Sequence, residues 1–227
     1  MKWRSLEEAK SGLGHATLAA ALDERRELMQ KYVPAEIQAE NRRSVEELNA
    51  SGLAGRILAK GAAAPNFEGT DHDGKTVSSA SLLARGPLVI VFFRGRWCPF
   101  CVAQLEAWND ILPQVRAAGA DVVAISPQTV HQSFLMRDQH KLAFPLLSDS
   151  GNSVARQFGL VYRVPGYQQK IYSRTFVNLP FINGDQSWEL PLPATYVVAK
   201  DGTIAYAAAD PDYTRRPEPF DVLGTAL

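Results

Sequence analysis

The sequence predicts an α/β fold, a central mixed sheet flanked by helices, that follows an N-terminal helical extension. Strand and helix patterns alternate from about residue 87 to residue 158, which is typical of a sheet with crossover helices. Residues 87–93 form one continuous apolar run, the pattern of a strand buried on both faces. Residues before 60 show helical periodicity instead. We therefore expect an extension at residues 1–60 and one sheet domain at 61–227.

The extension has the pattern of two amphipathic helices. Between Leu6 and Val33, apolar residues recur at helical spacing among charged ones, and Pro34 interrupts the pattern. Because proline is tolerated in a first helical turn, a second helix is expected to begin there, with Ile37, Val45 and Leu48 facing inward. Such a helical pair either covers its own domain or forms the arm of a homodimer, and the sequence leaves both open.

The domain itself reads as short strands and helices in alternation. We expect a hairpin at 66–78, strands at 87–93, 121–126 and 144–147, helices at 99–118, 129–141 and 152–158, and a closing hairpin at 195–208. The alternation predicts a mostly parallel sheet. Residues 159–193 read as a long irregular segment, which is typical of a lid or a binding element, although a small hairpin within it is the alternative.

The charge balance excludes some classes of partner. Lys and Arg together number 24, as do Asp and Glu, so no excess charge favours nucleic acid or an anionic membrane. No apolar run approaches the roughly 18 residues of a membrane span, and the N-terminus turns acidic at Glu7 and Glu8, where a signal peptide would turn apolar. We expect a soluble, cytoplasmic protein.

The chain has two cysteines, Cys98 and Cys101, spaced as Cys-Pro-Phe-Cys. Pro99 is suited to the first turn of a helix, so Cys98 is placed at a helix N-terminus, where the dipole and free amides stabilise a thiolate. The pKa of Cys98 is therefore expected to fall below the usual value of about 8.5, which makes this residue the nucleophile. Cys101 lies on the same helical face, within disulfide distance.

A purely structural role or a zinc site fits the two cysteines less well. Two structural core thiols would not require the preceding strand, the proline and the helix start. A zinc site would need further ligands, but His15, His72, His131 and His140 lack finger-like spacing and read as surface residues. We expect no metal and no cofactor.

Residues next to Cys98 are candidates for tuning its thiolate. Arg94 and Arg96 bracket the strand-to-helix turn, and a nearby cation lowers a thiol pKa. Arg94 is the better candidate because Arg96 is expected to point outward. Trp97 is expected to form a hydrophobic wall beside the nucleophile, or to serve only in the core.

The segment 92–101, Phe-Phe-Arg-Gly-Arg-Trp-Cys-Pro-Phe-Cys, resembles the active-site segment of the peroxiredoxin-like branch of the alkyl hydroperoxide reductase/thiol-specific antioxidant superfamily. The resemblance extends from about residue 62 to the end, through segments 64–67, 124–127, 147–149, 183–188, 192–196 and 212–219. It implies a thioredoxin-like fold and a thiol-dependent peroxidase. Cys98 would form a sulfenic acid that Cys101 resolves as a disulfide, and an external thiol such as thioredoxin or a glutathione system would reduce that disulfide.

The sequence departs from the superfamily pattern in two segments. Val91 and Gly95 stand where those proteins carry a proline and a hydroxyl residue, and Pro193-Ala194 replaces an arginine before Thr195. Pro193 instead resembles the cis-proline that thioredoxins place opposite their cysteines. Arg94 and Arg216 are candidate substitutes for the missing arginine, although a local salt bridge with Glu218 is the more expected role for Arg216.

The sequence therefore predicts Cys98 and Cys101 as catalytic residues. Substrate binding or thiolate tuning is assigned to six neighbours: Arg94, Gly95, Trp97, Pro99, Pro193 and Thr195. Two alternatives remain open, a protein-disulfide oxidoreductase and a non-enzymatic redox sensor whose N-terminal helices dock a partner.

Overall fold

The computed structural model describes residues 17–175 and 177–226. Two helices form the described part of the extension, α2 (Leu18–Tyr32) and α3 (Ala35–Ala50), followed by the short η1 (Leu53–Arg56). The part of the first expected helix before residue 17 lies outside the described residues. The Thr17 side chain caps α2 by accepting from the amide of Ala20 at 3.2 Å, and Pro34 separates the two helices as expected.

A seven-stranded sheet forms the centre of the molecule, with the order β2-β1-β5-β4-β3-β8-β9. Its strands are β1 (Glu68–Asp71), β2 (Thr76–Ser78), β3 (Leu88–Phe92), β4 (Asp121–Ser126), β5 (Leu146–Ser148), β8 (Ala194–Val198) and β9 (Ile204–Ala209). The expected central mixed sheet is confirmed. The expectation that it is mostly parallel is wrong: β4 runs parallel to β3 and β5, whereas the other described pairs are antiparallel because hairpins form both edges.

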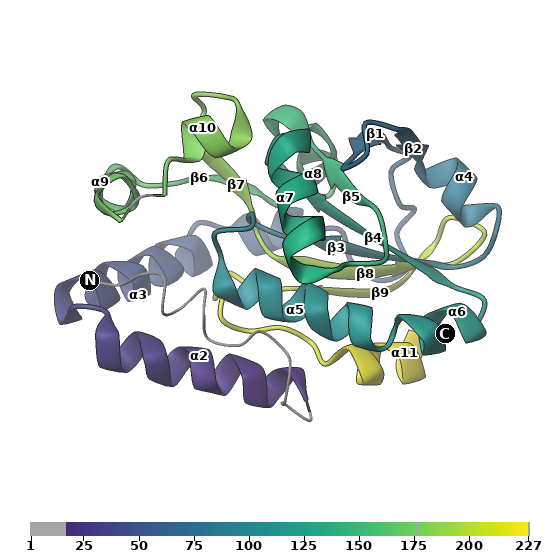
Figure 1. Ribbon diagram of the computed structural model, residues 1–227, viewed down its shortest axis with the longest axis horizontal. Helices are drawn as coiled ribbons and strands as arrows, with labels where there is room; N and C mark the ends of the chain where they lie inside the picture. The colour runs from purple at the N-terminus through teal and green to yellow at the C-terminus, as the bar shows by residue number, and fades with distance from the viewer. Residues whose placement is uncertain (1–16, 176, 227) are drawn as a thin grey trace.

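Helices cover both faces of this sheet (Figure 1). They are α4 (Ser79–Leu83), α5 (Pro99–Asp110), α6 (Leu112–Ala117), α7 (Val130–His140), η2 (Ser150–Asn152), α8 (Ser153–Gln157) and α11 (Pro219–Ala226). The single helix expected at 99–118 is in fact two, α5 and α6. Pro113, which has no amide hydrogen to continue the α5 ladder, lies in the first turn of α6. The sequence did not lead us to expect α11.

The segment 159–193 is not irregular throughout: it holds the antiparallel pair that the hairpin alternative allowed, and two helices that were not expected. It contains β6 (Val161–Arg163) and β7 (Glu189–Pro191), paired antiparallel, and the helices α9 (Gly166–Arg174) and α10 (Leu179–Asn183). These elements enclose a small core of their own that includes Val164, Leu179 and Leu190. Because its own apolar residues hold it in shape, this segment can position side chains over the end of the sheet.

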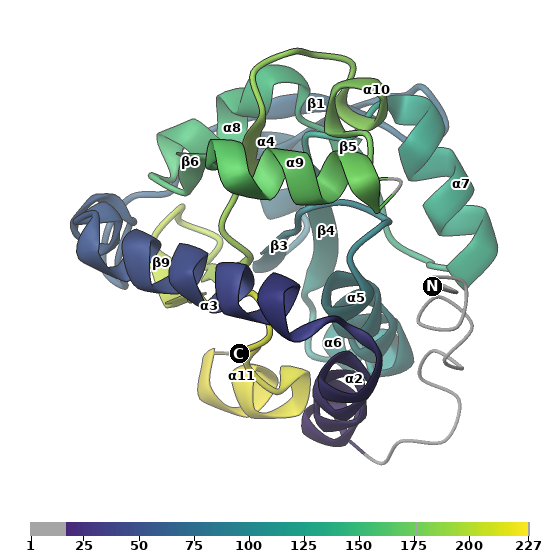
Figure 2. The same cartoon turned by 90° about the vertical axis from the view of Figure 1, so that its left-hand side faces the viewer.

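The extension lies on the same domain that it precedes. Leu18 and Leu22 of α2 belong to the hydrophobic core that includes α5, and Ser44 of α3 bonds to Gln168 of α9. Figure 2 shows α3 running between α9 and α2, across the end of the molecule where β3 leads to α5. Of the two roles considered for the extension, a cover on its own domain is therefore the one seen here.

Most of the large apolar side chains of the described residues are buried in the interior. All five residues of β3 are buried, which explains their uninterrupted apolar run.

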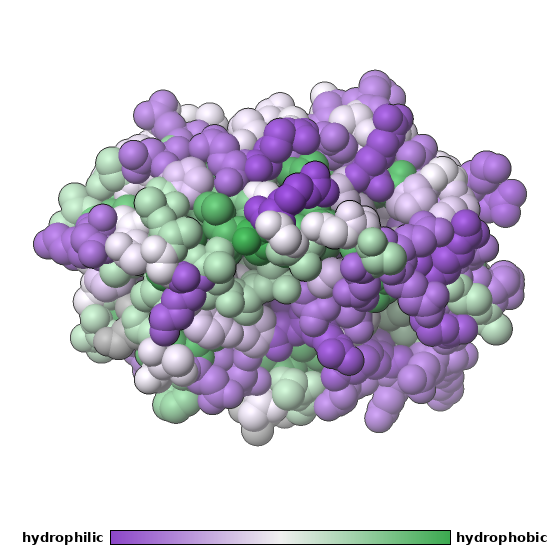
Figure 3. All heavy atoms as spheres, turned by 180° about the vertical axis from the view of Figure 1, so that it is seen from behind, coloured by the Kyte–Doolittle hydropathy of each residue, from purple (hydrophilic) through white to green (hydrophobic). Residues whose placement is uncertain are grey.

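On the face opposite to that of Figure 1, hydrophilic residues cover much of the surface, and hydrophobic ones gather near the middle (Figure 3). Among the described residues, no helix has the length and apolar character needed to cross a bilayer.

Candidate functional site

The two cysteines lie at the turn from β3 into α5. Cys98 is the N-cap of α5, and Pro99 occupies the first turn, as the sequence predicts. Gly95 shapes the turn: its φ is +144°, and a Cβ there would lie 2.6 Å from Trp97 Nε1. The two sulfurs share a hydrogen bond at 3.0 Å, while Cys98 is 1% exposed and Cys101 is 0% exposed. The pair is thus placed to form a disulfide but is closed to bulk solvent.

The charge of the pair does not fall where the sequence predicts. Burial and the hydrogen bond with Cys101 raise the pKa of Cys98 well above its usual value. Burial also acts to raise the pKa of Cys101, but the hydrogen bond from Cys98 and the cation of Arg216 lower it to about 5. The expected low pKa of Cys98 is therefore contradicted. Within the pair, the thiolate is favoured on Cys101, because Arg216 contacts that sulfur.

Arg94 lies beside Cys98 within an aromatic enclosure. It is 2% exposed and donates a short hydrogen bond to the hydroxyl of Tyr172. Its guanidinium lies 4.7 Å from the Trp97 ring and 4.3 Å from the Tyr213 ring. Arg96 instead extends to Gln139 at 3.4 Å, away from the sulfurs.

On the other side, Cys101 faces a buried polar chain. Arg216 Nη2 lies 3.5 Å from Cys101 Sγ, and its Nε donates to Gln104 Oε1 at 2.8 Å. Gln104 in turn donates to Thr195 Oγ1 at 3.0 Å. The local salt bridge expected between Arg216 and Glu218 is wrong, since both Glu218 carboxylate oxygens accept from the first amides of α2, those of Leu18 and Ala19.

Pro193 does not take the position expected of it. No cis peptide bond occurs in the described ranges 17–175 and 177–226, so its bond is trans and the resemblance to a thioredoxin cis-proline fails. Pro193 and Thr195 line a neighbouring cavity of about 250 Å³ with Arg216, on the Cys101 side of the pair. The six predicted neighbours therefore fall into two groups. Four lie at the Cys98 turn or its cavity, and two lie on the Cys101 side: Arg94, Gly95, Trp97 and Pro99 in the first group, Pro193 and Thr195 in the second.

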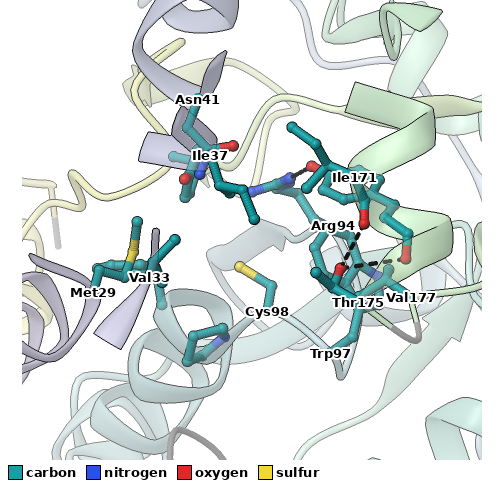
Figure 4. A pocket seen from close by; sticks show the side chains of 14 residues that line it. Met29, Val33, Ile37, Asn41, Arg94, Trp97, Cys98, Ile171, Thr175 and Val177 are labelled. Atoms are coloured by element: carbon teal, nitrogen blue, oxygen red, sulfur yellow. Dashed lines mark hydrogen bonds between the residues drawn. The ribbon is translucent and has the colours of Figure 1, made fainter. Parts of the chain in front are cut away.

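A cavity of about 60 Å³ opens onto Cys98 (Figure 4). Met29 and Val33 lie on one side of the sulfur, with Ile37 and Asn41 near them, and Arg94 and Trp97 lie on the other. The remaining wall comes from α9 and the residues after it: Ile171, Tyr172, Thr175 and Val177. Segment 159–193 thus contributes one wall of the cavity beside Cys98.

The sequence alone did not reveal several residues of this site. Gln104, Tyr172 and Tyr213 received no role, and Arg216 received the wrong one. Gln104 carried a usable signal, because a glutamine on the apolar face of a buried helix requires a polar partner. Tyr172 and Tyr213 lie far from the cysteines in sequence, and no local pattern distinguishes them.

The histidines are more enclosed than expected. His72 and His140 side chains are each 8% exposed, so the surface assignment is wrong for both. His72 Nδ1 accepts from the Leu146 amide, and His140 pairs with Glu106, so partners compensate their burial. His131 is exposed, and His15 lies outside the described residues. Within the part of the chain that the structure describes, no group of three His, Cys, Asp or Glu side chains is arranged to hold a metal.

Comparison with known proteins identifies the family of this fold and cysteine turn. The model of the AhpC/TSA family matches residues 60–207, more than half of the chain. The chain belongs to the AhpC/TSA family. The match includes β3, the cysteine turn and β8, and it leaves α2 and α3 outside.

Individual relatives agree with this family assignment. Chloroplastic peroxiredoxin Q of Oryza sativa subsp. japonica is 32% identical over 170 residues, which are 75% of this chain and 65% of that protein. The chain thus spans slightly less than two thirds of the length of the first curated relatives that it matches.

Two solved structures share the fold, so the thioredoxin-like fold expected from the sequence is confirmed. Peroxidoxin BcpB from Mycobacterium tuberculosis has a TM-score of 0.59 at 21% identity, covering 74% of this chain and 96% of that one. A yeast mitochondrial 1-Cys peroxiredoxin, described with a thiol-resolving mechanism via glutathione/thioredoxin systems, has a TM-score of 0.56 at 16% identity, covering 74% of each chain.

The cytoplasmic location predicted from the sequence is contradicted. The matched plant relatives from rice, wheat and Arabidopsis are named chloroplastic. The prediction rested on a missing apolar run at the N-terminus. Plastid transit peptides need no such run, because they are amphipathic and rich in Arg and Ser.

Proposed function

We propose that this protein reduces hydroperoxides at the expense of thiols, with Cys98 as the attacking sulfur and Cys101 as the resolving one. The observation that carries the proposal is the pair of sulfurs 3.0 Å apart at the start of α5, one of which borders a cavity. Membership of the AhpC/TSA family and the peroxiredoxin Q relatives support it.

The first step uses the proton shared by the two sulfurs. As Cys98 attacks the outer oxygen of ROOH, its proton passes to the Cys101 thiolate, an S–O bond forms and the O–O bond breaks. The leaving alkoxide then takes that proton from Cys101 and departs as the alcohol. Cys98 is oxidised to a sulfenic acid, and Cys101 is again a thiolate beside Arg216.

In the second step, the Cys101 thiolate attacks the sulfur of the Cys98 sulfenic acid. The disulfide forms, the S–O bond breaks, and hydroxide leaves and is protonated by solvent to water. An external dithiol then reopens the disulfide by exchange and is itself oxidised. Thioredoxin or a glutathione system is the proposed reductant, supported by the systems described for the similar yeast protein.

The other proposed site residues have separate tasks. Arg94 supplies a cation next to Cys98 and the developing alkoxide, with Trp97 and Tyr213 holding its guanidinium in place. Gly95 permits the turn that Trp97 packs against, Pro99 starts the helix, and Thr195 fixes Gln104.

Protein-disulfide exchange has less support. A protein disulfide needs an accessible attacking sulfur, but Cys98 is 1% exposed and Pro193 is not cis. The redox-sensor alternative requires the extension to change its docking with the oxidation state. Unchanged mobility of α2 and α3 between the reduced and oxidised forms would eliminate it.

The domain division at residue 60 forms part of the same proposal. The family match, which begins at residue 60, supports it.

The test compares hydroperoxide consumption with reduction of insulin disulfides, using one reducing system for the parent, Cys98→Ser and Cys101→Ser. We expect the parent to consume hydroperoxide faster than it reduces insulin, and Cys98→Ser to consume none above background. Hydroperoxide turnover that survives Cys98→Ser at the parent rate contradicts the proposal.

A further inference from the structure

The wall of the Cys98 cavity that comes from the extension has no counterpart in the family match. The match covers residues 60–207, whereas Met29, Val33, Ile37 and Asn41 come from α2, α3 and the bend between them. Figure 4 shows Met29 and Val33 across the sulfur from Arg94, and Ile37 and Asn41 above the sulfur, near the guanidinium of Arg94. The extension therefore provides part of the cavity surface that a bound molecule would contact.

The extension is fixed in this position by buried contacts. Arg25 of α2 is 2% exposed, and its Nε donates to the carbonyl oxygen of Pro99 at 3.1 Å, directly beside the cysteine turn. Glu218 caps the first amides of α2, and Gln38 of α3 donates to the Val33 carbonyl at 2.7 Å. A wall held by so many partners keeps one shape, so its chemistry can select among ligands.

The chemistry of that wall is mostly apolar. Met29, Val33 and Ile37 offer only hydrocarbon and thioether surface, and Asn41 is its one polar member. The charged group of the cavity, Arg94, lies across the sulfur from Met29 and Val33. A hydroperoxide with a compact hydrocarbon group can place its oxygens between Cys98 and Arg94 and bury the hydrocarbon against α2 and α3. Burial of one CH2 group contributes about 0.8 kcal/mol, so three methyl groups favour binding by more than tenfold. Hydrogen peroxide gains nothing from this surface and loses its bonds to water.

The volume sets an upper limit on the ligand. A cavity of about 60 Å³ can enclose a branched group of a few carbons, whereas most of a fatty acyl chain would extend out of it.

From these observations we infer that Met29, Val33 and Ile37 are specificity-determining residues that select small, branched alkyl hydroperoxides over hydrogen peroxide. This inference rests on the proposed function. Its new content is that selection comes from the helical extension and not from the family domain.

The test measures kcat/KM for tert-butyl hydroperoxide and for hydrogen peroxide in the full chain. The parent should prefer tert-butyl hydroperoxide by about tenfold. Ile37→Asn, which places an amide in the wall, should reduce that ratio by about fivefold, through a higher KM for the alkyl substrate with little change in kcat. Asn41→Leu should raise the ratio, since it extends the apolar wall.

Val45→Asn is the matched control. Val45 is half-buried on α3 like Ile37, but it lines a different cavity, with Arg42 and Glu46, and its substitution should leave the ratio unchanged. If both peroxides are reduced but the ratio is the same in the parent, Ile37→Asn and Asn41→Leu, the inference is overturned and the proposed function stands. If the parent reduces neither peroxide, both fail.

Discussion

Cys98 and Cys101 are one helical turn apart, yet they face different surroundings. Cys98 borders an apolar cavity beside Arg94, whereas Cys101 faces Arg216 and the Gln104–Thr195 pair. Burial acts to raise the pKa of both thiols, but the pKa of Cys98 is raised, whereas the hydrogen bond from Cys98 and the cation of Arg216 lower that of Cys101 to about 5. Access to a ligand is thus provided at one sulfur, and the thiolate is favoured at the other.

The largest expected effect tests whether the two sulfurs differ in role. Cys98→Ser should lower hydroperoxide turnover by on the order of a thousandfold, because it removes the sulfur that borders the cavity. Cys101→Ser should retain one stoichiometric oxidation per protein and then stop, since the sulfenic acid is not resolved. Stopped-flow and steady-state consumption of tert-butyl hydroperoxide measure both. Equal loss of the first oxidation in the two variants would remove the distinction.

A second change acts on the charge at Cys101. Arg216→Gln removes the cation that favours the thiolate, so the pKa of Cys101 should rise from about 5 by roughly one to two units. At pH 6 the parent pair is mostly ionised, whereas roughly half to a tenth of the variant pair would be, which should slow disulfide formation by about twofold to tenfold. Thiolate absorbance against pH measures the shift.

Arg215→Gln is the control for this titration. Arg215 is exposed and pairs with Asp212 at 3.4 Å, so its loss should leave the midpoint in place. A midpoint that stays near 5 in Arg216→Gln would contradict the assignment of the charge.

The turn that separates the two environments should be intolerant of a side chain. Gly95→Ala adds a Cβ 2.6 Å from Trp97 Nε1 at a φ of +144°, and we expect a loss of about 2 kcal/mol in the free energy of unfolding. Gly74→Ala also has a positive φ, +81°, but has no atom within 4 Å, so it should cost less. Chemical denaturation compares the two, and equal losses would show that Trp97 does not constrain the turn.

The smallest expected effect on activity comes from a change next to Arg94, in the surroundings of Cys98. Tyr172→Phe removes the hydroxyl that accepts from Arg94, with an expected loss of about 1 kcal/mol, or roughly fivefold in kcat/KM. The ionisation near pH 5 should move little, because the low pKa of Cys101 depends more on Cys98 and Arg216 than on Arg94, and Arg94 keeps its charge without the hydroxyl. Tyr206→Phe, on β9 and outside the cavity lining, is the control. A shifted midpoint in Tyr172→Phe would show that the two environments are coupled.

Features set by residues close together in the sequence could be predicted from it, whereas features set by residues far apart could not. β3 and β4 were predictable because their apolar runs are local, and the position of Cys98 followed from the adjacent Pro99. The break between α5 and α6 also has a local cause, since Pro113 lies in the first turn of α6. The Cys101 environment was not predictable, because Arg216 comes from a segment more than a hundred residues away, and its cation reverses the expected order of the two pKa values.

The central claim is that hydroperoxide oxygen goes to Cys98 although the charge rests on Cys101. Reaction of each single-cysteine variant with one equivalent of tert-butyl hydroperoxide, followed by dimedone trapping and peptide mass spectrometry, tests it directly. We predict a sulfenic acid adduct on Cys98 in Cys101→Ser and no comparable adduct on Cys101 in Cys98→Ser. An adduct that forms on Cys101 as fast as on Cys98 would contradict the account.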